Sequence, residues 1–344
     1  MPSPVDYDRL HKTARAIVAD RKGILAADES TGTIKKRFDS IGVESTEENR
    51  RFYRQLLFTA PGMEEHIGGV ILYDETIRQS ADDGTPFPEV LASKGVIPGI
   101  KVDTGAQDMA LFPGEKVTEG LDGLRGRLEE YRGLGARFAK WRAVITIGDG
   151  IPTDGCIRVN AHALARYAAL CQEAGLVPIV EPEVLMDADN TLEVCREVTT
   201  RTLHETFVAL YELALYLEGT LLKPNMVIPG KGSSQEATAE EIAQATVSTF
   251  RGVVPAAVPG IVFLSGGQSE VQATENLNAI NRVGGPWALS FSYGRALQQS
   301  ALQAWAGDSG NAEAAQTAFV HRARMNALAV AGGWSAELEQ PVTA

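Results

Sequence analysis

The chain has few of the residues that mark secreted or disulfide-rich proteins. Only three of its 344 residues are cysteines, Cys156, Cys171 and Cys195, and no CxxC spacing occurs. A small, odd number of cysteines is typical of a reduced cytosolic protein in which these side chains fill the core. We therefore expect no disulfide framework and a cytoplasmic location.

Histidine is also scarce, which argues against one common kind of metal site. The five histidines are scattered along the chain at His11, His66, His162, His204 and His321. None of them has the HxH or HExxH spacing that brings two zinc ligands together. The sequence thus predicts no histidine-built zinc site, and we expect no metal.

Long apolar runs and an excess of positive charge are lacking too. No apolar run approaches the roughly 18 residues that a membrane span needs. Residues 1–8 lack the basic start and apolar core of a signal peptide. The formal net charge of −12 argues against nucleic acid and anionic membranes as partners, although it is compatible with a small basic pocket.

The chain does contain short β-type runs with helical stretches between them. Eight runs recur, at 23–28, 68–74, 99–103, 137–145, 176–183, 217–223, 260–265 and 287–292. Helices are predicted at 7–19, 47–58, 120–135, 158–173, 191–215, 239–250, 271–280 and 312–331. Capping-box patterns at 45–48, 238–241 and 269–272 mark three helix starts.

Eight strands alternating with helices predict an α/β fold, a (β/α)8 TIM barrel with extra N- and C-terminal helices. The alternative is a doubly wound sheet, which often has a Gly-rich first turn. The first turn here, DESTGT at 28–33, does not match GxGxxG. With no repeat and no long linker, we expect residues 1–344 to form a single barrel domain.

Charged or hydroxyl side chains follow every one of the eight runs. Active sites of such barrels form where the strands end. Because alternate residues of a strand share a face, Lys101 should project with Asp103, Lys140 with Arg142, and Glu181 with Glu183. These pairs would interleave cations and carboxylates at the barrel mouth. The plainer interpretation is a ring of structural salt bridges, and we expect that role for Asp103 and Glu183.

Lys223 stands out among these strand-end residues. It closes the apolar run 216–222, and Pro224 follows it. An unpaired ammonium is costly at the end of a buried strand, whereas a lysine that has lost its proton is a nucleophile toward carbonyls. The cations Lys140 and Arg142 would favour the neutral amine. The plainer interpretation is a lysine whose stem is buried while its ammonium reaches solvent.

The remaining strand ends offer proton carriers and anion sites around that amine. Asp28 and Glu181 provide carboxylates for proton transfer. Residues 265–267 and 294–295 provide a hydroxyl, flexible amides and a guanidinium, at the loops where such barrels bind phosphate. Residues 30–33, followed by the basic run 35–37, can receive a second anion. A Ser-Gly-Gly turn alone is weak evidence, but two anion sites around one amine indicate a substrate phosphorylated at both ends.

The chain resembles class I fructose-1,6-bisphosphate aldolase, the Schiff-base, metal-independent type. The resemblance runs from about residue 7 to about residue 330. Its motifs, in collinear order, are GILAADESTG (23–32), EENRRFYR (47–54), FAKWR (138–142), VEPE (180–183), LLKPNM (221–226), FLSGGQS (263–269) and FSYGRAL (291–297).

The resemblance implies a role for each matching residue. Lys223 would be the Schiff-base lysine, Glu181 an acid/base in imine formation and dehydration, and Asp28 and Lys140 would assist carbinolamine chemistry and carbon–carbon cleavage. The ketone-side phosphate would bind Ser265, Gly266, Gly294 and Arg295. The far phosphate would bind Ser30, Thr33 and Lys101. Positions near the substrate are matched by Lys36, Arg37 and Arg142, and no cofactor is implied.

Two departures from the family pattern stand out. Thr33 replaces the serine of many members, and its hydroxyl should preserve binding. Many members also have a tail ending in tyrosine, which assists proton exchange on the enamine and favours the bisphosphate. Residues 339–344 contain no tyrosine. The preference for fructose 1,6-bisphosphate over fructose 1-phosphate is therefore open at this point.

The expected function is reversible cleavage of fructose 1,6-bisphosphate to dihydroxyacetone phosphate and glyceraldehyde 3-phosphate, in glycolysis and gluconeogenesis. The expected partners are phosphorylated ketose and triose substrates and copies of the chain in a homotetramer. Two alternatives are another Schiff-base barrel aldolase with a different phosphosugar, and a binding scaffold that keeps only the fold.

Overall fold

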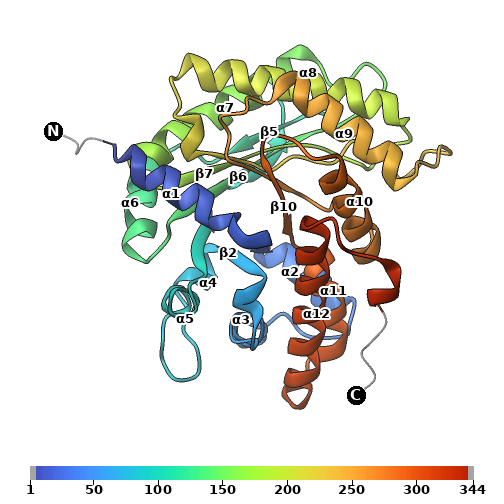
Figure 1. Cartoon of the computed structure of the whole chain (residues 1–344). Coiled ribbons are helices and arrows are strands. Elements are labelled where there is room, and N and C mark those ends of the chain that lie inside the picture. Colours follow the sequence, from blue (N-terminus) through green and yellow to red (C-terminus); the bar gives the residue numbers. More distant parts are fainter. Residues whose placement is uncertain (1–4, 340–344) are drawn as a thin grey trace.

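Eight parallel strands close into a barrel in the computed structural model of the chain, which describes residues 5–339 (Figure 1). Neighbouring strands follow the order β1-β10-β9-β8-β7-β6-β3-β2. The first and last strands pair directly, with Ile24 opposite Ser292. This closed order confirms the predicted TIM barrel and is incompatible with an open, doubly wound sheet.

The barrel strands match the eight predicted runs closely. They are β1 (Gly23–Ala27), β2 (Ile67–Leu72), β3 (Ile97–Lys101), β6 (Phe138–Ile145), β7 (Val177–Val184), β8 (Leu221–Leu222), β9 (Gly260–Phe263) and β10 (Ala288–Tyr293). The run 217–223 is the poorest match, because Leu217–Gly219 forms a 3-10 helix, η3, and only Leu221 and Leu222 pair as a strand.

Helices cover the outside of the barrel, and α1 and α12 are the predicted extra ones. The bounds are α1 (Tyr7–Ile17), α2 (Thr31–Asp39), α3 (Glu47–Phe58), α4 (Asp74–Ile77), α5 (Phe87–Ser93), α6 (Leu124–Gly133), α7 (Asp154–Glu173), α8 (Leu192–Glu212), α9 (Ala239–Val253), α10 (Glu270–Val283), α11 (Arg295–Trp305) and α12 (Ala312–Val330). Short 3-10 turns are η1 (Ala19–Arg21), η2 (Met63–Glu65), η4 (Ser309–Asn311) and η5 (Ala336–Glu339).

Several elements were not predicted from the sequence. Helices α2 and α11 begin in the stretches interpreted as anion-binding loops, so these loops are in fact helix N-termini. The short helices α4 and α5 follow β2. An antiparallel hairpin, β4 (Gly105–Asp108) and β5 (Lys116–Glu119), extends from the end of β3. These additions all lie after strand ends, where they shape the barrel mouth.

Helix α1 closes the end of the barrel opposite that mouth. Its residues Leu10, Ala14 and Ile17 are buried against inward-facing side chains near the strand starts, including Ile24 and Val177. The helix is strongly amphipathic in sequence, which explains how its apolar face fills this opening. Figure 1 shows it as the first long helix, lying across the strands.

A glycine permits the tight packing inside the barrel. A Cβ atom at Gly99 would lie 2.2 Å from the Phe138 ring of the neighbouring strand β6, so a larger residue would displace the ring. Phe138 is fully buried and belongs to the same core as α1. The ring therefore takes the place of a side chain on β3.

The predicted helix caps agree with the structure in part. The capping box of Thr238 and Glu241 is present, and Ser269 accepts the amide of Gln272. The box predicted at 45–48 is wrong by one residue, because Thr46 caps α3 by accepting the amide of Asn49 at 3.1 Å.

The three cysteines are free and buried in α7 and α8, as expected of core residues.

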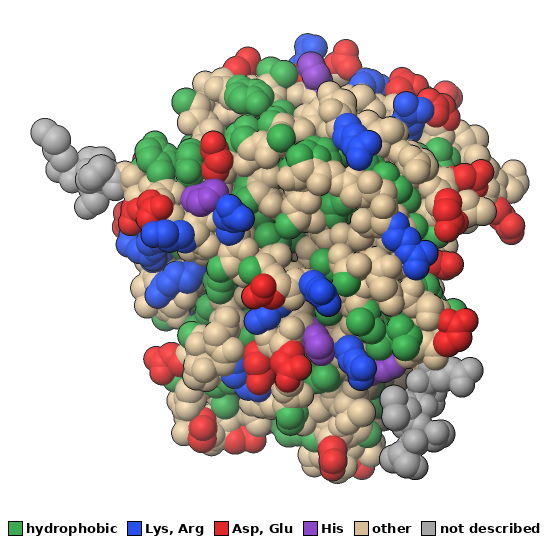
Figure 2. All heavy atoms as spheres, in the orientation of Figure 1, with side chains coloured by type: hydrophobic (Ala, Val, Ile, Leu, Met, Phe, Trp, Pro, Cys, Tyr) green, Lys and Arg blue, Asp and Glu red, His purple; other side chains and the backbone are tan. Residues whose placement is uncertain are grey.

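Figure 2 shows acidic and basic side chains interspersed over one face of the molecule. No helix within residues 5–339 is long and apolar enough to cross a membrane. The prediction about a tail without tyrosine falls largely on residues 340–344, outside the described part of the chain.

Candidate active site

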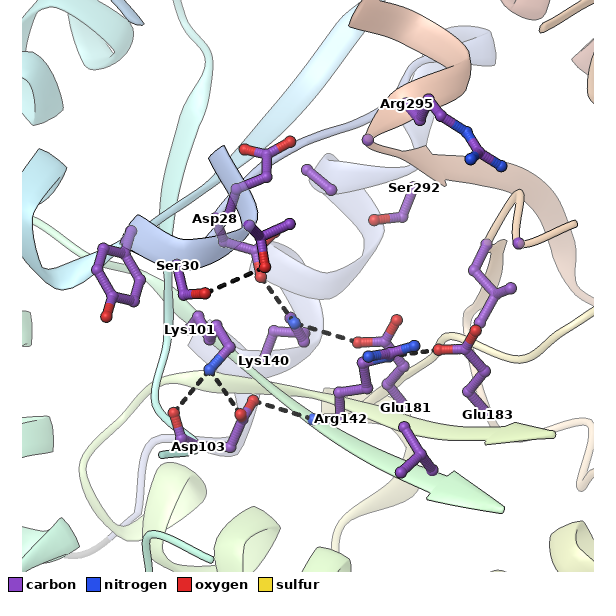
Figure 3. A pocket seen from close by; sticks show the side chains of 18 of the residues that line it. Asp28, Ser30, Lys101, Asp103, Lys140, Arg142, Glu181, Glu183, Ser292 and Arg295 are labelled. Atoms are coloured by element: carbon purple, nitrogen blue, oxygen red, sulfur yellow. Dashed lines mark hydrogen bonds and ion pairs between the residues drawn. The ribbon is translucent and has the colours of Figure 1, made fainter. Parts of the chain in front are cut away.

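One pocket of about 770 Å³ opens where the barrel strands end (Figure 3). Every site residue proposed from the sequence lines it. They are Asp28, Ser30, Thr33, Lys36, Arg37, Lys101, Lys140, Arg142, Glu181, Glu183, Lys223, Ser265, Gly266, Gly294 and Arg295. Residues up to 267 positions apart in the chain thus meet at a single cavity, as the strand-end argument requires.

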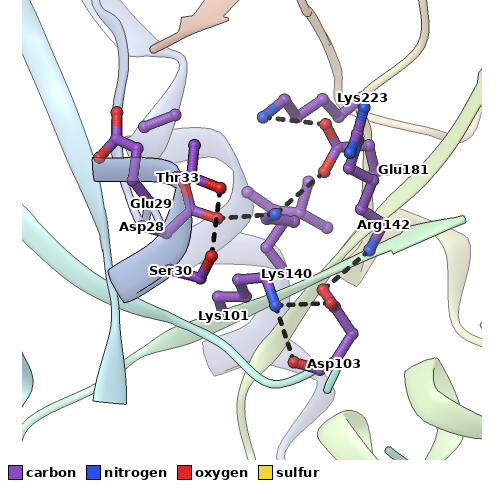
Figure 4. Close-up of polar contacts among 12 residues, drawn as sticks. Asp28, Glu29, Ser30, Thr33, Lys101, Asp103, Lys140, Arg142, Glu181 and Lys223 are labelled. Carbon is purple, nitrogen blue, oxygen red and sulfur yellow. Dashed lines mark hydrogen bonds and ion pairs between the residues drawn. The ribbon is translucent and has the colours of Figure 1, made fainter. Parts of the chain in front are cut away.

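Lys223 extends into this pocket from the end of β8. Its backbone N–H donates to the Val180 carbonyl at 2.8 Å, which continues the pairing with β7 by one residue. Its side chain is buried, and Nζ lies 3.1 Å from Glu181 Oε1 (Figure 4). Glu181, one of the two carboxylates expected around this amine, is therefore its ion-pair partner among residues 5–339.

Lys140 bridges two carboxylates in the middle of the site. Its Nζ lies 2.7 Å from Asp28 Oδ2 and 3.3 Å from Glu181 Oε2 (Figure 4). Burial by itself would lower the pKa of Lys140, but the charges of Asp28 and Glu181 outweigh burial and raise that pKa well above its ordinary value. Lys140 therefore carries a positive charge at neutral pH.

The same contacts keep Asp28 and Glu181 ionised. Burial alone would raise the pKa of each carboxyl, but Lys140 and Lys223 outweigh burial and lower both pKa values. Two lysine side chains and two carboxylates thus alternate in a buried space. Such a set can pass a proton between neighbours without leaving a net charge away from water.

Two further ion pairs surround this centre and agree with the predicted shared strand faces. Lys101 Nζ lies 2.6 Å from Asp103 Oδ1, and Arg142 pairs with Glu183. The other oxygen of Asp103 accepts the backbone N–H of Arg142 at 3.2 Å. Asp103 therefore ties the end of β3 to β6, as expected of a structural carboxylate.

The ends of β9 and β10 provide amides and hydroxyls at the pocket wall. Ser265 and Gly266 follow β9, and Gly294 is the residue before helix α11. A Cβ at Gly266 would lie 3.1 Å from Glu183 Oε1, and one at Gly294 would lie 3.3 Å from Arg37 Nη2. Glycine at these two places lets charged side chains approach the backbone closely.

The other wall is formed by the start of α2. The hydroxyls of Ser30 and Thr33 lie 3.1 Å apart, and Ser30 makes no side-chain capping bond to the helix. The amides of Thr33 and Ile34 donate to the Ser30 carbonyl, so the two neighbouring hydroxyls and the positive end of the helix are what this wall offers an anion. The basic residues Lys36 and Arg37 lie one turn further along the same helix.

Some pocket residues were not proposed as site residues from the sequence. They include Glu29, Ser40, Tyr73, Thr104, Ser292 and Gln299. Ser292, on β10, carries a buried hydroxyl without a hydrogen-bond partner among the described residues, and it could have been found because it ends the predicted run 287–292. Asp74 and Glu75, at the end of the predicted run 68–74, belong to α4 and pair with Arg78 and Arg50, and they do not line the pocket.

Residues 5–339 contain no group of three or more histidine, cysteine, aspartate or glutamate side chains arranged to hold a metal ion. The residues that line the pocket provide amines, guanidinium groups, carboxylates, hydroxyls and amides. This set is suited to amine attack on a carbonyl, proton transfer and anion binding.

Comparisons with known proteins agree with this chemistry. The family model for class I fructose-bisphosphate aldolase matches residues 9–344. A protein of Xanthomonas campestris, "Probable fructose-bisphosphate aldolase class 1", is 60% identical over 96% of this chain and 99% of its own length. "Fructose-bisphosphate aldolase 4, cytosolic" of Arabidopsis thaliana is 55% identical over 92% of this chain and 81% of its own.

A solved structure is similar over nearly the whole chain. The aldolase of Plasmodium falciparum, crystallised with TRAP and a small-molecule inhibitor, superimposes with a TM-score of 0.95 at 50% identity, covering 97% of this chain and 98% of its own. The family match, the identities and the shared barrel lead to one conclusion. This chain is a lyase and belongs to the class I fructose-bisphosphate aldolase family.

Proposed function

We propose that the chain reversibly cleaves fructose 1,6-bisphosphate to dihydroxyacetone phosphate and glyceraldehyde 3-phosphate through an imine on Lys223. The observation that carries the proposal is the position of Lys223 Nζ, buried in the pocket and 3.1 Å from Glu181. Membership of the aldolase family supports the substrate, and the two walls rich in amides, hydroxyls and cations support a phosphate at each end.

The first half of the reaction forms the imine. Lys223 passes a proton to Glu181, its nearest carboxylate, and the free amine attacks the C2 carbonyl of the open-chain ketose. The carbinolamine then loses its hydroxyl as water, with the proton supplied by Glu181. Lys140, held positive by its two carboxylates, stabilises the oxygen that carries negative charge during attack.

The second half breaks the bond between C3 and C4. Asp28, kept ionised by Lys140, takes the proton from the C4 hydroxyl. The C3–C4 electron pair moves onto C3 and into the iminium, which yields the enamine and frees glyceraldehyde 3-phosphate. Protonation of the enamine carbon and hydrolysis of the imine then release dihydroxyacetone phosphate and restore Lys223.

Each phosphate has a separate wall in this proposal. Ser265, Gly266, Gly294 and Arg295 bind the ketone-side phosphate, and Ser30, Thr33 and Lys101 bind the far phosphate. Lys36, Arg37 and Arg142 lie alongside the substrate, and Glu183 holds Arg142 in place. The chain takes part in glycolysis and gluconeogenesis, acts in the cytoplasm and assembles as a homotetramer. These three statements rest on the family and on the cytosolic Arabidopsis relative.

The test measures cleavage of fructose 1,6-bisphosphate by the purified chain in EDTA. Lys223→Met should lower kcat by at least about 10³-fold. Lys231→Met is the matched control, because Lys231 is exposed and pairs with Asp187, and it should leave kcat unchanged. Wild-type activity that disappears in EDTA, or a fully active Lys223→Met, would overturn the proposal. Faster cleavage of another phosphosugar, such as a sedoheptulose phosphate, would support the second aldolase interpretation.

A further inference from the structure

A cluster of charges extends from one wall of the pocket into the interior, and only Arg37 among its members has a place in the proposed function. Its members are Glu29 after β1, Arg37 on α2, Arg54 on α3 and Gln298 on α11. Glu29, Arg54 and Gln298 are all buried, whereas Arg37 keeps 22% of its side chain exposed and lines the pocket. The cluster therefore connects the protein interior with the cavity through Arg37.

The carboxylate of Glu29 is the centre of this cluster. Arg54 Nη2 lies 2.5 Å from its Oε2, while Arg37 pairs with Oε1. Gln298 Nε2 donates to Oε1 at 3.0 Å and to the Ala26 carbonyl at 2.8 Å, which fixes the position of the carboxylate. Burial would raise the pKa of Glu29, but the two guanidinium groups outweigh burial and lower it, so Glu29 is ionised.

The charges of the cluster do not balance. Two guanidinium groups share one carboxylate, so the sum is one positive charge. The adjacent Asp28 does not supply the missing negative charge, because it is engaged by Lys140 at 2.7 Å. Arg54 is only 3% exposed, and Glu29 is its one carboxylate partner among residues 5–339. A buried guanidinium without a partner is costly, so Arg54 must retain its share of Glu29.

The uncompensated charge is therefore presented by Arg37. This side chain lies against the start of α11, where a Cβ at Gly294 would be 3.3 Å from Arg37 Nη2 and 3.7 Å from Glu29 Oε1. An anion at this wall would meet the Gly294 backbone and a guanidinium that is only partly neutralised. Without Arg54, Glu29 would be free to neutralise Arg37 completely.

We propose that Arg54 is a positioning residue for anion binding: it engages Glu29 from the interior and so leaves Arg37 with positive charge for a phosphate at the Gly294 wall. The identity of that anion as a substrate phosphate rests on the proposed function. The electrostatic arrangement itself does not rest on the proposed function. Binding of inorganic phosphate can test it without any cleavage of a sugar substrate.

The experiment measures the Kd of inorganic phosphate by isothermal titration calorimetry on the intact chain. Arg54→Met should weaken binding roughly tenfold, the effect of one charge about 10 Å away at an effective dielectric of 20. Arg54→Lys keeps the charge and should stay within about twofold of wild type. The double variant Arg54→Met/Glu29→Gln restores a sum of one positive charge, and its Kd should return to within about threefold of wild type.

Two results would overturn the inference. One is wild-type phosphate affinity in Arg54→Met, and the other is a double variant that binds as weakly as Arg54→Met. A purely structural role for Arg54 predicts the second result, since removing Glu29 as well would not repair packing. If Arg54→Met does not fold, the single variant Glu29→Gln provides the test. In that variant the cluster carries two positive charges, so the chain should bind phosphate more tightly than the wild type does. An unchanged phosphate affinity would contradict the inference. Failure of the wild type to cleave the sugar would leave these comparisons intact.

Discussion

Replacing Lys140 by methionine should destabilise the chain in a pH-dependent way. Lys140 lies 2.7 Å from Asp28 and 3.3 Å from Glu181, and all three side chains are largely buried. At an effective dielectric of 20, unit charges at these separations attract by about 6 and about 5 kcal/mol. Desolvation offsets much of this attraction, and removing one partner of a buried pair lowers the free energy of unfolding by about 3–5 kcal/mol.

The sign of the pH dependence follows from the pKa shifts. In the wild type the pKa values of Asp28 and Glu181 are lowered, so their stabilising contribution is complete above about pH 4 and is lost only as the pH falls further. In Lys140→Met, burial dominates and raises the pKa of one carboxyl. The folded variant then holds one extra proton and loses about 1.4 kcal/mol of stability per pH unit, from about pH 4 up to that raised pKa.

Urea unfolding followed by tryptophan fluorescence at pH 4.5, 6 and 7.5 measures this effect. The difference in unfolding free energy between wild type and variant should be about 3 kcal/mol larger at pH 7.5 than at pH 4.5. Lys116→Met is the matched control, because its pair with Asp108 is exposed, and it should cost less than about 1 kcal/mol at every pH. Equal, pH-independent effects of the two variants would refute the charge balance described for the site.

Three further predictions concern catalysis and domain organisation. Glu181→Gln should lower kcat by about 10²–10⁴-fold in a steady-state cleavage assay, because it removes the proton carrier beside Lys223; a smaller loss would exclude that role. Lys101→Met should raise the KM for fructose 1,6-bisphosphate more than the KM for fructose 1-phosphate. Equal increases in the two KM values would show that Lys101 does not bind the far phosphate. Residues 1–344 should unfold in one calorimetric transition; two resolved transitions would contradict a single domain.

Much of the fold and of the site could be predicted from the sequence, because both depend on strand ends. Each barrel strand is an apolar run with polar residues directly after it, and parallel strands bring those residues to one face. Lys223, Lys140 and Glu181 could therefore be placed in one cavity before any coordinates were known. The alternation of strand faces also paired Lys101 with Asp103 correctly.

What the sequence could not provide was the pairing between strands. That Glu181 lies beside Lys223 depends on the register between β7 and β8, which leaves no local signal. The burial of Arg54 and its pairing with Glu29 could not be predicted either. A basic residue on a helix is normally exposed, and only tertiary packing brings this one against Glu29. Helices α2 and α11 were missed because the residues at their starts, 30–33 and 294–295, were assigned to anion-binding loops.

The central claim is that Lys223 forms an imine with the ketose or triose phosphate. Borohydride reduction of the chain with dihydroxyacetone phosphate, followed by proteolysis and mass spectrometry, tests this most directly. We predict that the triose is attached to Lys223 and that Lys140, held protonated by Asp28 and Glu181, stays unmodified. An unmodified Lys223, or attachment at Lys140 in its place, would contradict the account.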